Sequence, residues 1–368
     1  MCSLEPITIN TLNEYIQVIK EKKLSEYYFR GENDEYPTIS SSLLRKETSV
    51  LLKNKSFSFY EDVVNYYYSE IASNIGELER ENFLAFSQHH GLTTNLIDFT
   101  TSPLIALYFA CERKNNNSKE NNGFVYLINK NNTIDISKII NEEFESPAYS
   151  YNLTEKFVSN KRFFRTFSAY LNDFFCNSSF DLYKDILIKQ SINLFTITNG
   201  LTQTFLEEYI EMTKNISKTT LFDDLSTLLS KHLSRYDMRI EGVPFLTGIY
   251  IILLREYFET LSSMSFLNNK EGTIEFPQMP YLIYKTPYKF DRIRNQDGVF
   301  LYQLFHTYAT QYEDVPNAIV RQVITPDITI IVNNQKQILE ELDFIGINLK
   351  SIYGDFDNTA SYINNKFF

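Results

Sequence analysis

Three short polar blocks, far apart in the chain, hold the residue types that could bind a charged ligand. The first is Arg30-Gly31, at the end of a predicted strand over residues 26–29. The second runs from Asp98 to Ser102, after a predicted strand over residues 96–99. The third is Gln296, just before a predicted strand over residues 298–304. If these ends meet, they bring together a guanidinium, a carboxylate, three hydroxyls and an amide.

Each residue of these blocks also has a purely structural interpretation. Arg30 offers a planar fork for a phosphate and Gly31 permits a close backbone approach, but Arg30 could equally form an internal salt bridge, for instance with Asp98. Asp98 either caps the following turn, which is the commoner role, or anchors a neighbouring side chain. Of Thr100, Thr101 and Ser102, one hydroxyl is expected to cap the helix that starts at Pro103, which leaves two for a ligand.

The adjacent pair His89-His90 is a poor metal site. Neighbouring side chains point to different sides of a helix or strand, and no cysteine or third histidine lies nearby in the sequence. We therefore expect no bound metal. One imidazole is expected to be buried against the backbone and the other to face a cleft.

Two basic runs could bind anions. The first, in a chain of net charge -11, is either an anion site or a solvated turn; it comprises Lys285, Lys289, Arg292 and Arg294. The second mixes Lys156, Lys161, Arg162 and Arg165 with four phenylalanines and could stack on nucleic acid. Its helical spacing favours an amphipathic core helix instead.

Composition restricts the classes of function. The 368 residues are 43% hydrophobic, which is typical of a globular protein. The acidic balance, with a pI near 5.0, makes non-specific nucleic-acid binding unexpected. The longest apolar run, Val243–Leu254, is too short for a membrane span. No secretory signal is visible, and the three cysteines form no disulfide or metal-binding motif. A cytoplasmic protein without membrane contact is expected. Standard nucleotide-binding, kinase and hydrolase motifs are absent.

The hydrophobic pattern predicts an α+β fold with a mixed or antiparallel β core. Strands are expected near both ends of the chain, and helices dominate residues 134–270. We therefore divide the chain into an N-terminal part over 1–133, a helical insertion over 134–270 and a C-terminal part over 271–368. The predicted helices of the insertion cover residues 152–171, 180–197, 203–216, 221–233 and 244–261.

Three blocks resemble the FRG domain family, named for its Phe-Arg-Gly signature. These are YFRG at residues 28–31, the long segment QHHGLTTNLIDFTTSPLIALYFA from Gln88, and RIRNQDGVF from Arg292 with the tail SIYGDFDNTASYI. The match spans both ends and skips the helical insertion. The chain departs from the family where Asn95 replaces an arginine of a Pro-Thr-Arg motif and Phe99 replaces a tryptophan, which puts any anion-binding role of that arginine in doubt here.

The order of the blocks is also similar to that in some ADP-ribosyltransferases, which implies a split β-sheet and NAD as the substrate. In that resemblance Arg30 grips the pyrophosphate, Thr100 or Thr101 supports the nicotinamide ribose and Gln296 holds the ribose 2′-hydroxyl. Gly31, His89, His90, Asp98 and Ser102 complete the expected dinucleotide site. The family commonly has Glu where this chain has Gln296, and a neutral amide implies slow transfer, another base, or no catalysis.

The sequence thus leaves three hypotheses. The first is an ADP-ribosyltransferase-like enzyme acting on an unknown macromolecular acceptor, as a bacterial toxin or anti-phage effector. The second is a non-catalytic module that binds a nucleotide or phosphorylated ligand. The third is an RNA-directed effector that uses the basic and aromatic helix around Arg162.

Overall fold

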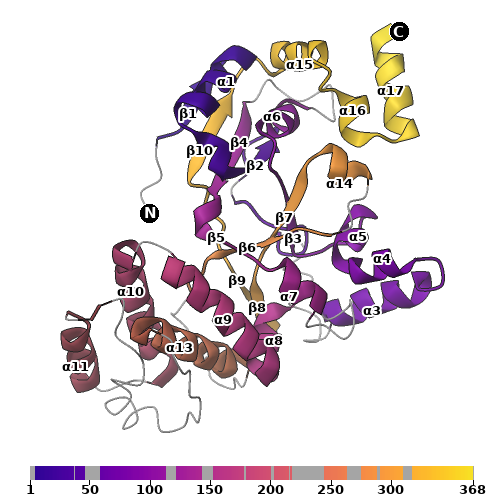
Figure 1. The fold of residues 1–368 in the computed structure, drawn as a ribbon. Helices are drawn as coiled ribbons and strands as arrows, with labels where there is room; N and C mark the ends of the chain where they lie inside the picture. The colour runs from indigo at the N-terminus through magenta and orange to yellow at the C-terminus, as the bar shows by residue number, and fades with distance from the viewer. Residues whose placement is uncertain are drawn as a thin grey trace.

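The protein has an α+β fold built on one large mixed β-sheet (Figure 1). The structure, a computed structural model, describes residues 5–36, 38–45, 59–112, 122–142, 152–177, 180–199, 203–214, 216–217, 244–262, 275–287, 291–309 and 317–367. The predicted helix over 221–233 lies outside these residues.

Eight strands form the sheet in the order β1-β10-β4-β2-β3-β7-β6-β5. The two edge pairs, β1 with β10 and β5 with β6, are parallel, and every other pair is antiparallel. The strands are β1 (Ile7–Ile9), β2 (Tyr27–Glu32), β3 (Leu96–Thr100), β4 (Gly123–Asn129), β5 (Thr133–Asp135), β6 (Tyr281–Tyr284), β7 (Gly298–Tyr302) and β10 (Ile328–Val332).

The sheet is split at its centre. Strands β2 and β3 pair at a single position, Phe29 opposite Thr100, whereas β2 pairs with β4 along its whole length. Beyond Phe29 the two strands diverge. On the sides that face each other, the backbone groups of Arg30 and Asp98 therefore have no partner strand. The sheet is therefore two four-stranded halves joined by one residue pair.

The first half-sheet is covered by helices from both ends of the chain. Their apolar faces form one core with the strands, and Tyr15, Leu107 and Ile338 are fully buried in it. Helix α1 begins after Thr11, whose hydroxyl accepts a hydrogen bond from the Glu14 amide at 3.2 Å. These helices are α1 (Leu12–Glu21), α6 (Pro103–Cys111) and α15 (Gln335–Phe344).

Helix α6 packs unusually close to the strands beneath it. A Cβ atom placed on Gly31 would lie 1.8 Å from the Ala106 carbonyl oxygen, and one on Gly123 would lie 2.1 Å from that of Ala110. Both strands therefore need glycine where the helix crosses them. We expected Gly31 to admit a ligand, but its missing side chain makes room for α6.

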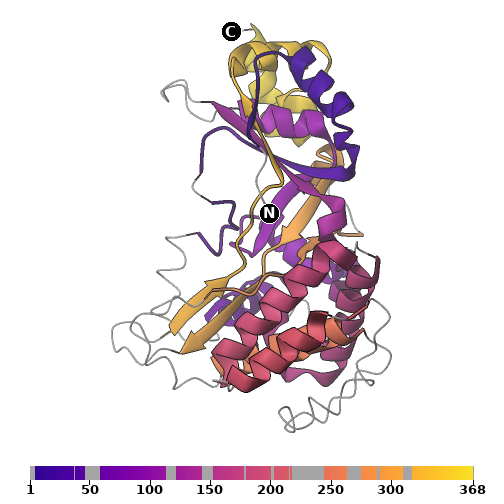
Figure 2. The same cartoon turned by 90° about the vertical axis from the view of Figure 1, so that its left-hand side faces the viewer.

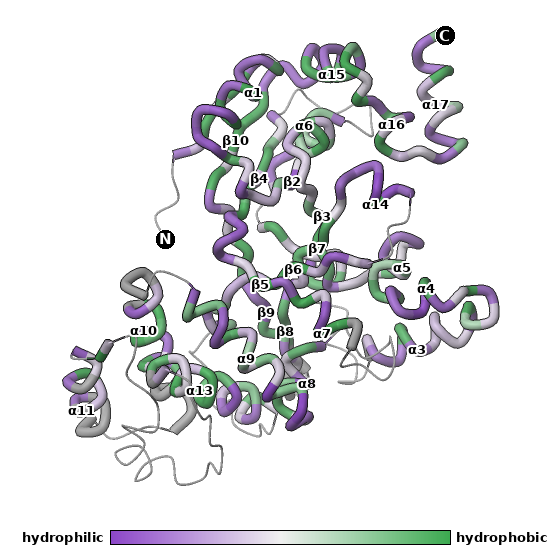
Figure 3. Tube along the Cα trace, in the orientation of Figure 1, coloured by the Kyte–Doolittle hydropathy of each residue, from purple (hydrophilic) through white to green (hydrophobic). Residues whose placement is uncertain are grey.

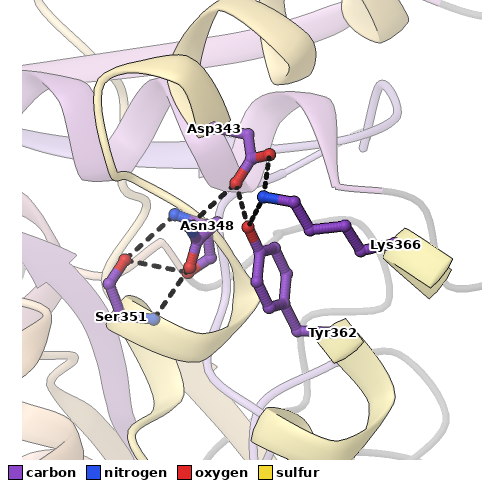
Figure 4. A network of polar contacts seen from close by, with 5 residues as sticks. All are labelled: Asp343, Asn348, Ser351, Tyr362 and Lys366. Atoms are coloured by element: carbon purple, nitrogen blue, oxygen red, sulfur yellow. Dashed lines mark hydrogen bonds and ion pairs between the residues drawn. The ribbon is translucent and has the colours of Figure 1, made fainter. Parts of the chain in front are cut away.

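The C-terminal segment, α16 (Leu349–Tyr353) and α17 (Phe356–Phe367), is held by a polar network (Figure 4). The Asp343 carboxylate accepts hydrogen bonds from Asn348 and from the Tyr362 hydroxyl, both at 2.8 Å. The Lys366 ammonium donates to the same hydroxyl at 2.8 Å. None of the residues of α17 is buried, so these polar contacts hold the helix in place.

The second half-sheet shares its core with the helices between β5 and β6. Phe300 and Tyr302 of β7 belong to the same apolar cluster as Phe163, Phe167 and Leu253 of those helices. Figure 2 shows these helices beside the β8–β9 ribbon, at the end of the molecule opposite the C-terminal helices. The elements are α7 (Ser137–Glu142), α8 (Leu153–Ser159), α9 (Lys161–Asn177), α10 (Phe180–Asn199), α11 (Gln203–Lys214), α13 (Phe245–Ser262), β8 (Phe305–Ala309) and β9 (Asn317–Arg321).

Two helical regions are each broken by an asparagine. Residues 77–89 form α4 (Glu77–Glu81) and α5 (Phe83–His89), separated at Asn82, whose side-chain oxygen accepts a hydrogen bond from Thr286. The predicted helix over 152–171 breaks at Asn160, which accepts from the Phe163 amide and starts α9. Helix α3 (Phe59–Ile71) precedes α4 in the chain. Among the described residues, no helix combines the length and apolar character needed to cross a membrane.

Candidate ligand cavity

A cavity of about 860 Å³ opens where the two half-sheets diverge. We call it the arginine cavity, because four arginines line it. Its walls come from β2, β3, the loop 33–45, the end of α6, α14 (Asp291–Asn295), β9 and α16. The lining residues are Phe29, Arg30, Gly31, Glu32, Asn33, Tyr36, Thr38, Ser40, Arg45, Asp98, Phe99, Thr100, Phe109, Glu112, Arg292, Gln296, Arg321 and Tyr353.

Arg30 spans the gap between the half-sheets. Its Nη1 donates to the backbone carbonyl of Asp98 at 2.7 Å, which supplies the partner that the diverging strand lacks. Its Nε donates to Glu32 at 2.7 Å. Arg30 therefore forms an internal salt bridge, with Glu32 and not with the Asp98 carboxylate. A guanidinium has five N–H donors, so about three remain for a ligand.

Glu32 is the most buried carboxylate of the cavity, at 9% exposure. One oxygen receives the Arg30 hydrogen bond, and the buried Oε2 has no hydrogen-bond partner among the described residues. A buried carboxylate oxygen that receives no hydrogen bond lowers the stability of the fold, unless a ligand or a water molecule donates to it. The charge of Glu32 thus lies beside Arg30 with one acceptor unused.

The other three arginines have no carboxylate partner among the described residues. Arg45 and Arg292 are exposed, and the Arg292 guanidinium lies 5.0 Å from the ring centre of Tyr353. Arg321 is partly buried, and this burial lowers the pKa of its guanidinium. Three arginines that form no salt bridge with a described residue place positive charge at the cavity in a chain of net charge -11.

Gln296 is held at the cavity by its backbone. It follows α14, the hydrophilic turn beside the apolar β7 in Figure 3. Its amide donates to the Arg292 carbonyl at 3.0 Å, and its carbonyl accepts from the Thr100 hydroxyl at 2.7 Å. Its side-chain Nε2 is buried and has no hydrogen-bond partner in the described part of the chain. Gln296 thus carries an unused donor at the cavity wall.

The hydroxyl cluster is used differently from our expectation. The Thr100 hydroxyl donates to Gln296 and accepts from the Ser102 amide at 2.9 Å. Ser102 is the N-cap residue of α6, but its side chain makes no capping bond. The Thr101 amide donates to the Asp297 carbonyl at 3.1 Å. Thr100 lines the cavity with its hydroxyl already engaged, while Thr101 and Ser102 are not among the lining residues.

Asp98 lines the cavity, and its exposed carboxylate accepts a hydrogen bond from the Gln88 amide at 2.8 Å. His89 and His90 stack edge to face with ring centres 4.9 Å apart and are not among the lining residues. Burial, then the neighbouring charges of His90 and Arg292, lower the pKa of His89. The described residues contain no group of three metal-ligating side chains.

An aromatic wall faces the arginines. Phe29, Tyr36, Phe109 and Tyr353 line the cavity together with the carboxylate of Glu112. Glu112 accepts hydrogen bonds from the Tyr353 hydroxyl at 2.9 Å and from the Tyr108 hydroxyl at 3.1 Å. Burial, and then the charge of Glu112, raises the pKa of Tyr353, so this hydroxyl stays protonated and remains a donor. Phe29 is fully buried, and Tyr353 contacts the Phe109 ring edge to face with ring centres 6.3 Å apart.

Asn95, which replaces the family's arginine, lies away from the cavity. It is fully buried and its side chain donates to the Gln303 carbonyl at 3.1 Å. Phe99, which replaces the tryptophan, lines the cavity and is 4% exposed. The four arginines of the cavity therefore come from positions other than Asn95, where the family has an arginine.

The basic and aromatic helix is a core element. Phe157, Phe163, Phe164 and Phe167 are all buried, and the Arg255 guanidinium lies 4.8 Å from the Phe164 ring centre. This confirms the amphipathic-helix interpretation of residues 161–177. Buried rings cannot stack on bases, so the structure gives no support to the RNA hypothesis at this helix.

Sequence reasoning missed several cavity residues, among them Glu32, Glu112, Arg321 and Tyr353. Glu32 follows the Arg-Gly signature directly and could have been found from its position. Arg321 comes from β9, a strand that we did not predict. Glu112 and Tyr353 reach the cavity only through the packing of α6 against α16.

Comparison with known proteins gives one match. A model of the FRG domain matches residues 25–119, which include β2, β3, α6 and the cavity residues from Phe29 to Glu112. No curated protein and no solved structure matches the chain. Gln296, Arg321 and Tyr353 lie outside the matched residues.

Proposed function

Because residues 25–119 form an FRG domain that supplies one wall of the arginine cavity, we propose that this cavity binds NAD and that the protein transfers ADP-ribose from it. One observation carries the proposal. Arg30, Asp98, Thr100 and Gln296, which lie far apart in the sequence, line one cavity with three further arginines.

The cavity has the size and chemistry that a dinucleotide needs. Its volume of about 860 Å³ falls within the range of small-molecule sites, roughly 300–1,000 Å³. Arginines bind phosphate oxygens in a bidentate way, and the remaining donors of Arg30 suit the diphosphate. The aromatic wall around Phe109 and Tyr353 suits stacking of an adenine or nicotinamide ring.

The proposed reaction breaks the bond between nicotinamide nitrogen and ribose C1′. The bonding electron pair leaves with nicotinamide, which becomes neutral, and C1′ develops oxocarbenium character. The acceptor's nucleophile then forms a bond to C1′ and releases its proton to solvent. The carboxylate of Glu32 can stabilise the developing positive charge, and the unused Nε2 of Gln296 can donate to a ribose hydroxyl. Thr100 fixes the Gln296 backbone in this scheme.

Incubation of the purified protein with labelled NAD and a cell lysate tests the proposal. We expect nicotinamide release, label transfer to an acceptor and a higher Tm with NAD. Arg30→Gln should abolish the NAD-dependent rise in Tm. Absence of all three effects in the unmodified protein would exclude the function.

The second candidate is a non-catalytic module that binds a nucleotide or phosphorylated ligand. Two observations favour it: the Thr100 hydroxyl is already engaged, and position 296 carries a neutral amide. In this case NAD or another nucleotide raises the Tm without nicotinamide release. The same experiment therefore separates the two candidates.

A role as a bacterial toxin or defence effector rests on the resemblance alone. If the protein consumes NAD, its expression in bacteria should lower the cellular NAD level and slow growth. Glu32→Gln should relieve both effects when expressed to the same level. Equal toxicity of the two proteins would argue against an NAD-consuming effector.

A further inference from the structure

Arg321 at the end of β9 is placed to receive an anion. It lines the arginine cavity, is partly buried and has no salt bridge to any described residue. Its one hydrogen bond within the described residues is a long one, from Nη1 to the Ser40 hydroxyl at 3.4 Å. Burial lowers the pKa of the Arg321 guanidinium, as expected for a charge that has lost water without gaining a counter-ion. A bound anion would stabilise it.

The position of Arg321 is distinct from that of Arg30. Ser40, its neighbour, contacts the Gln303 side chain at 3.4 Å, and the Gln303 amide donates to the Asn95 carbonyl at 3.0 Å. This anchors Arg321 at the start of β3. Arg30 instead bonds the carbonyl of Asp98, three residues further along the strand. The two guanidinium groups are thus held by different parts of the structure.

Arg45 belongs to the same end of the cavity as Arg321. The segment that carries it runs beside the start of β3, because the Leu43 amide donates to the Thr94 carbonyl at 3.0 Å. Arg45 lines the cavity and has no acidic partner among the described residues. The Arg321–Ser40 contact and the segment that carries Arg45 therefore both lie beside the start of β3.

We propose that the cavity takes a dinucleotide with a third phosphate on a ribose, of the NADP type, and prefers it to NAD. This rests on the proposed function, in which Arg30 binds the diphosphate. The ribose phosphate lies at the Arg321 end, where Arg321, Arg45 and the Ser40 hydroxyl contact its oxygens. An arginine beside the ribose is a general means of accommodating a 2′-phosphate, and bidentate binding gives it specificity.

Calorimetric titration of the full chain with NAD and with NADP tests this preference. We expect NADP to bind at least about tenfold more tightly than NAD, because hydrogen bonds to a charged phosphate are strong. Arg321→Gln should remove this preference, because it should lower NADP affinity at least about tenfold more than it lowers NAD affinity. Arg30→Gln should weaken both ligands. Arg294→Gln, an exposed arginine paired with Asp291 and not among the lining residues, is the matched control and should change neither affinity.

The outcomes separate the inference from the proposed function. If NAD and NADP bind equally well to the unmodified protein, the phosphate subsite is wrong and the NAD site stands. If neither dinucleotide binds, the proposed function is wrong and the inference falls with it. Arg321→Lys guards against an effect of misfolding, because it keeps the positive charge. A loss of preference in Arg321→Gln with an intermediate value in Arg321→Lys supports the subsite.

Discussion

At the scale of single residues, the cavity combines a structural ion pair with unused polar atoms. Arg30 and Glu32 form an ion pair, and Arg30 also donates to the backbone of the opposite half-sheet. Their remaining donors and the free Oε2 of Glu32 are available to a ligand. The pair therefore holds its own geometry before a ligand arrives, which lowers the entropy cost of binding.

We predict that Glu32→Gln destabilises the protein by about 3 kcal/mol, because removing one partner leaves the largely buried Arg30 without its counter-charge. Urea unfolding measures the difference. Asp98→Asn is the matched control, because this carboxylate lines the same cavity but is exposed, and it should cost less than about 0.5 kcal/mol. Equal effects of the two substitutions would contradict the role of the Arg30–Glu32 pair.

His306 should give the stability a pH dependence on the acid side. Its ring lies between the hydroxyls of Thr154 at 3.1 Å and Ser262 at 2.9 Å, and burial lowers its pKa to about 4. The unfolded chain binds a proton near pH 6.5, whereas the folded chain does so only near pH 4. Stability should therefore fall by about 3 kcal/mol as the pH drops through this window.

Urea unfolding at pH 7 and pH 4.5 checks the His306 prediction. His306→Gln should flatten the dependence between these values, even if its stability at pH 7 is lower. An unchanged slope in His306→Gln would show that other groups cause it.

The residues of the cavity were predictable only in part. Arg30, Asp98, Thr100 and Gln296 were found because they lie in or beside predicted strands, although Arg30 and Asp98 lie inside β2 and β3 and not at their ends. The direction in which each side chain points could not be predicted, because it depends on strand register. His89, His90, Thr101 and Ser102 lie close in sequence to cavity residues but do not line the cavity. Their roles in ligand binding stay predictions.

At the scale of elements, the contact of α6 with β2 and β4 positions one wall of the cavity. Because Ala106 and Ala110 carbonyls touch the strands at two glycines, α6 cannot lie further from the sheet without losing its packing. Phe109 and Glu112 of the cavity wall are carried by this helix or its end. Helix placement and cavity shape are thus linked.

We predict that Gly31→Ala lowers the free energy of unfolding by about 3 kcal/mol, because its Cβ would clash with helix backbone that cannot move freely. Gly76→Ala is the control: its Cβ would meet only the flexible end of the Glu79 side chain. Thermal unfolding of both variants measures the difference. A Gly31→Ala protein with unchanged Tm would show that α6 can shift outward.

Helix α17 should separate from the molecule in acid. Although burial raises the pKa of Asp343, the hydrogen bonds from Tyr362 and Asn348 and the charge of Lys366 outweigh it and hold this pKa below its usual value. A lowered carboxylate pKa gives stability that is present above pH ~4 and lost as the pH falls further. Hydrogen exchange of the α17 amides should therefore accelerate below that pH.

The variant Asp343→Asn tests the α17 network directly. It should show fast exchange of the α17 amides at neutral pH, with amides of the central strand β4 unchanged. Slow exchange in this variant would mean that the apolar residues of α17 hold it in place without the network.

Long periodic elements were predicted well and short ones were not. Strands β2, β3 and β7 were expected near their observed bounds, because each is a run of branched or aromatic residues. Strands β1 and β5 have three residues each and carry too little pattern to detect. The break at Asn82 depends on a hydrogen bond from Thr286, which is distant in sequence, and the break at Asn160 depends on a local helix cap. Hydrophobic periodicity predicts neither.

At the scale of the whole molecule, the helical block is the connection between two parallel strands. Strands β5 and β6 pair in parallel, and parallel neighbours require a crossover. Here the crossover has grown into α7 to α13, which share a core with β7. The sequence predicted the helical block and its position in the chain. It did not predict that the block shares a core with β7, because a shared core depends on tertiary packing.

We predict that replacing residues 152–262 with a short Gly-Ser linker abolishes cooperative folding, because the second half-sheet would expose Phe300 and Tyr302. Circular dichroism during heating measures the transition. A variant that still unfolds cooperatively, within a few degrees of the full chain, would show that the block is an independent unit.

The pairing of β1 with β10 at the edge of the sheet determines when the sheet can be completed during synthesis. Ile7 pairs with Ile330, so β1 has no partner strand until residues 328–332 have left the ribosome. Gln296 and Arg321 are also made late, while Arg30 and Asp98 are made early. A nascent chain therefore carries half of a binding site for most of its translation. If the finished protein consumes dinucleotides, this delay keeps each copy inert until it is complete.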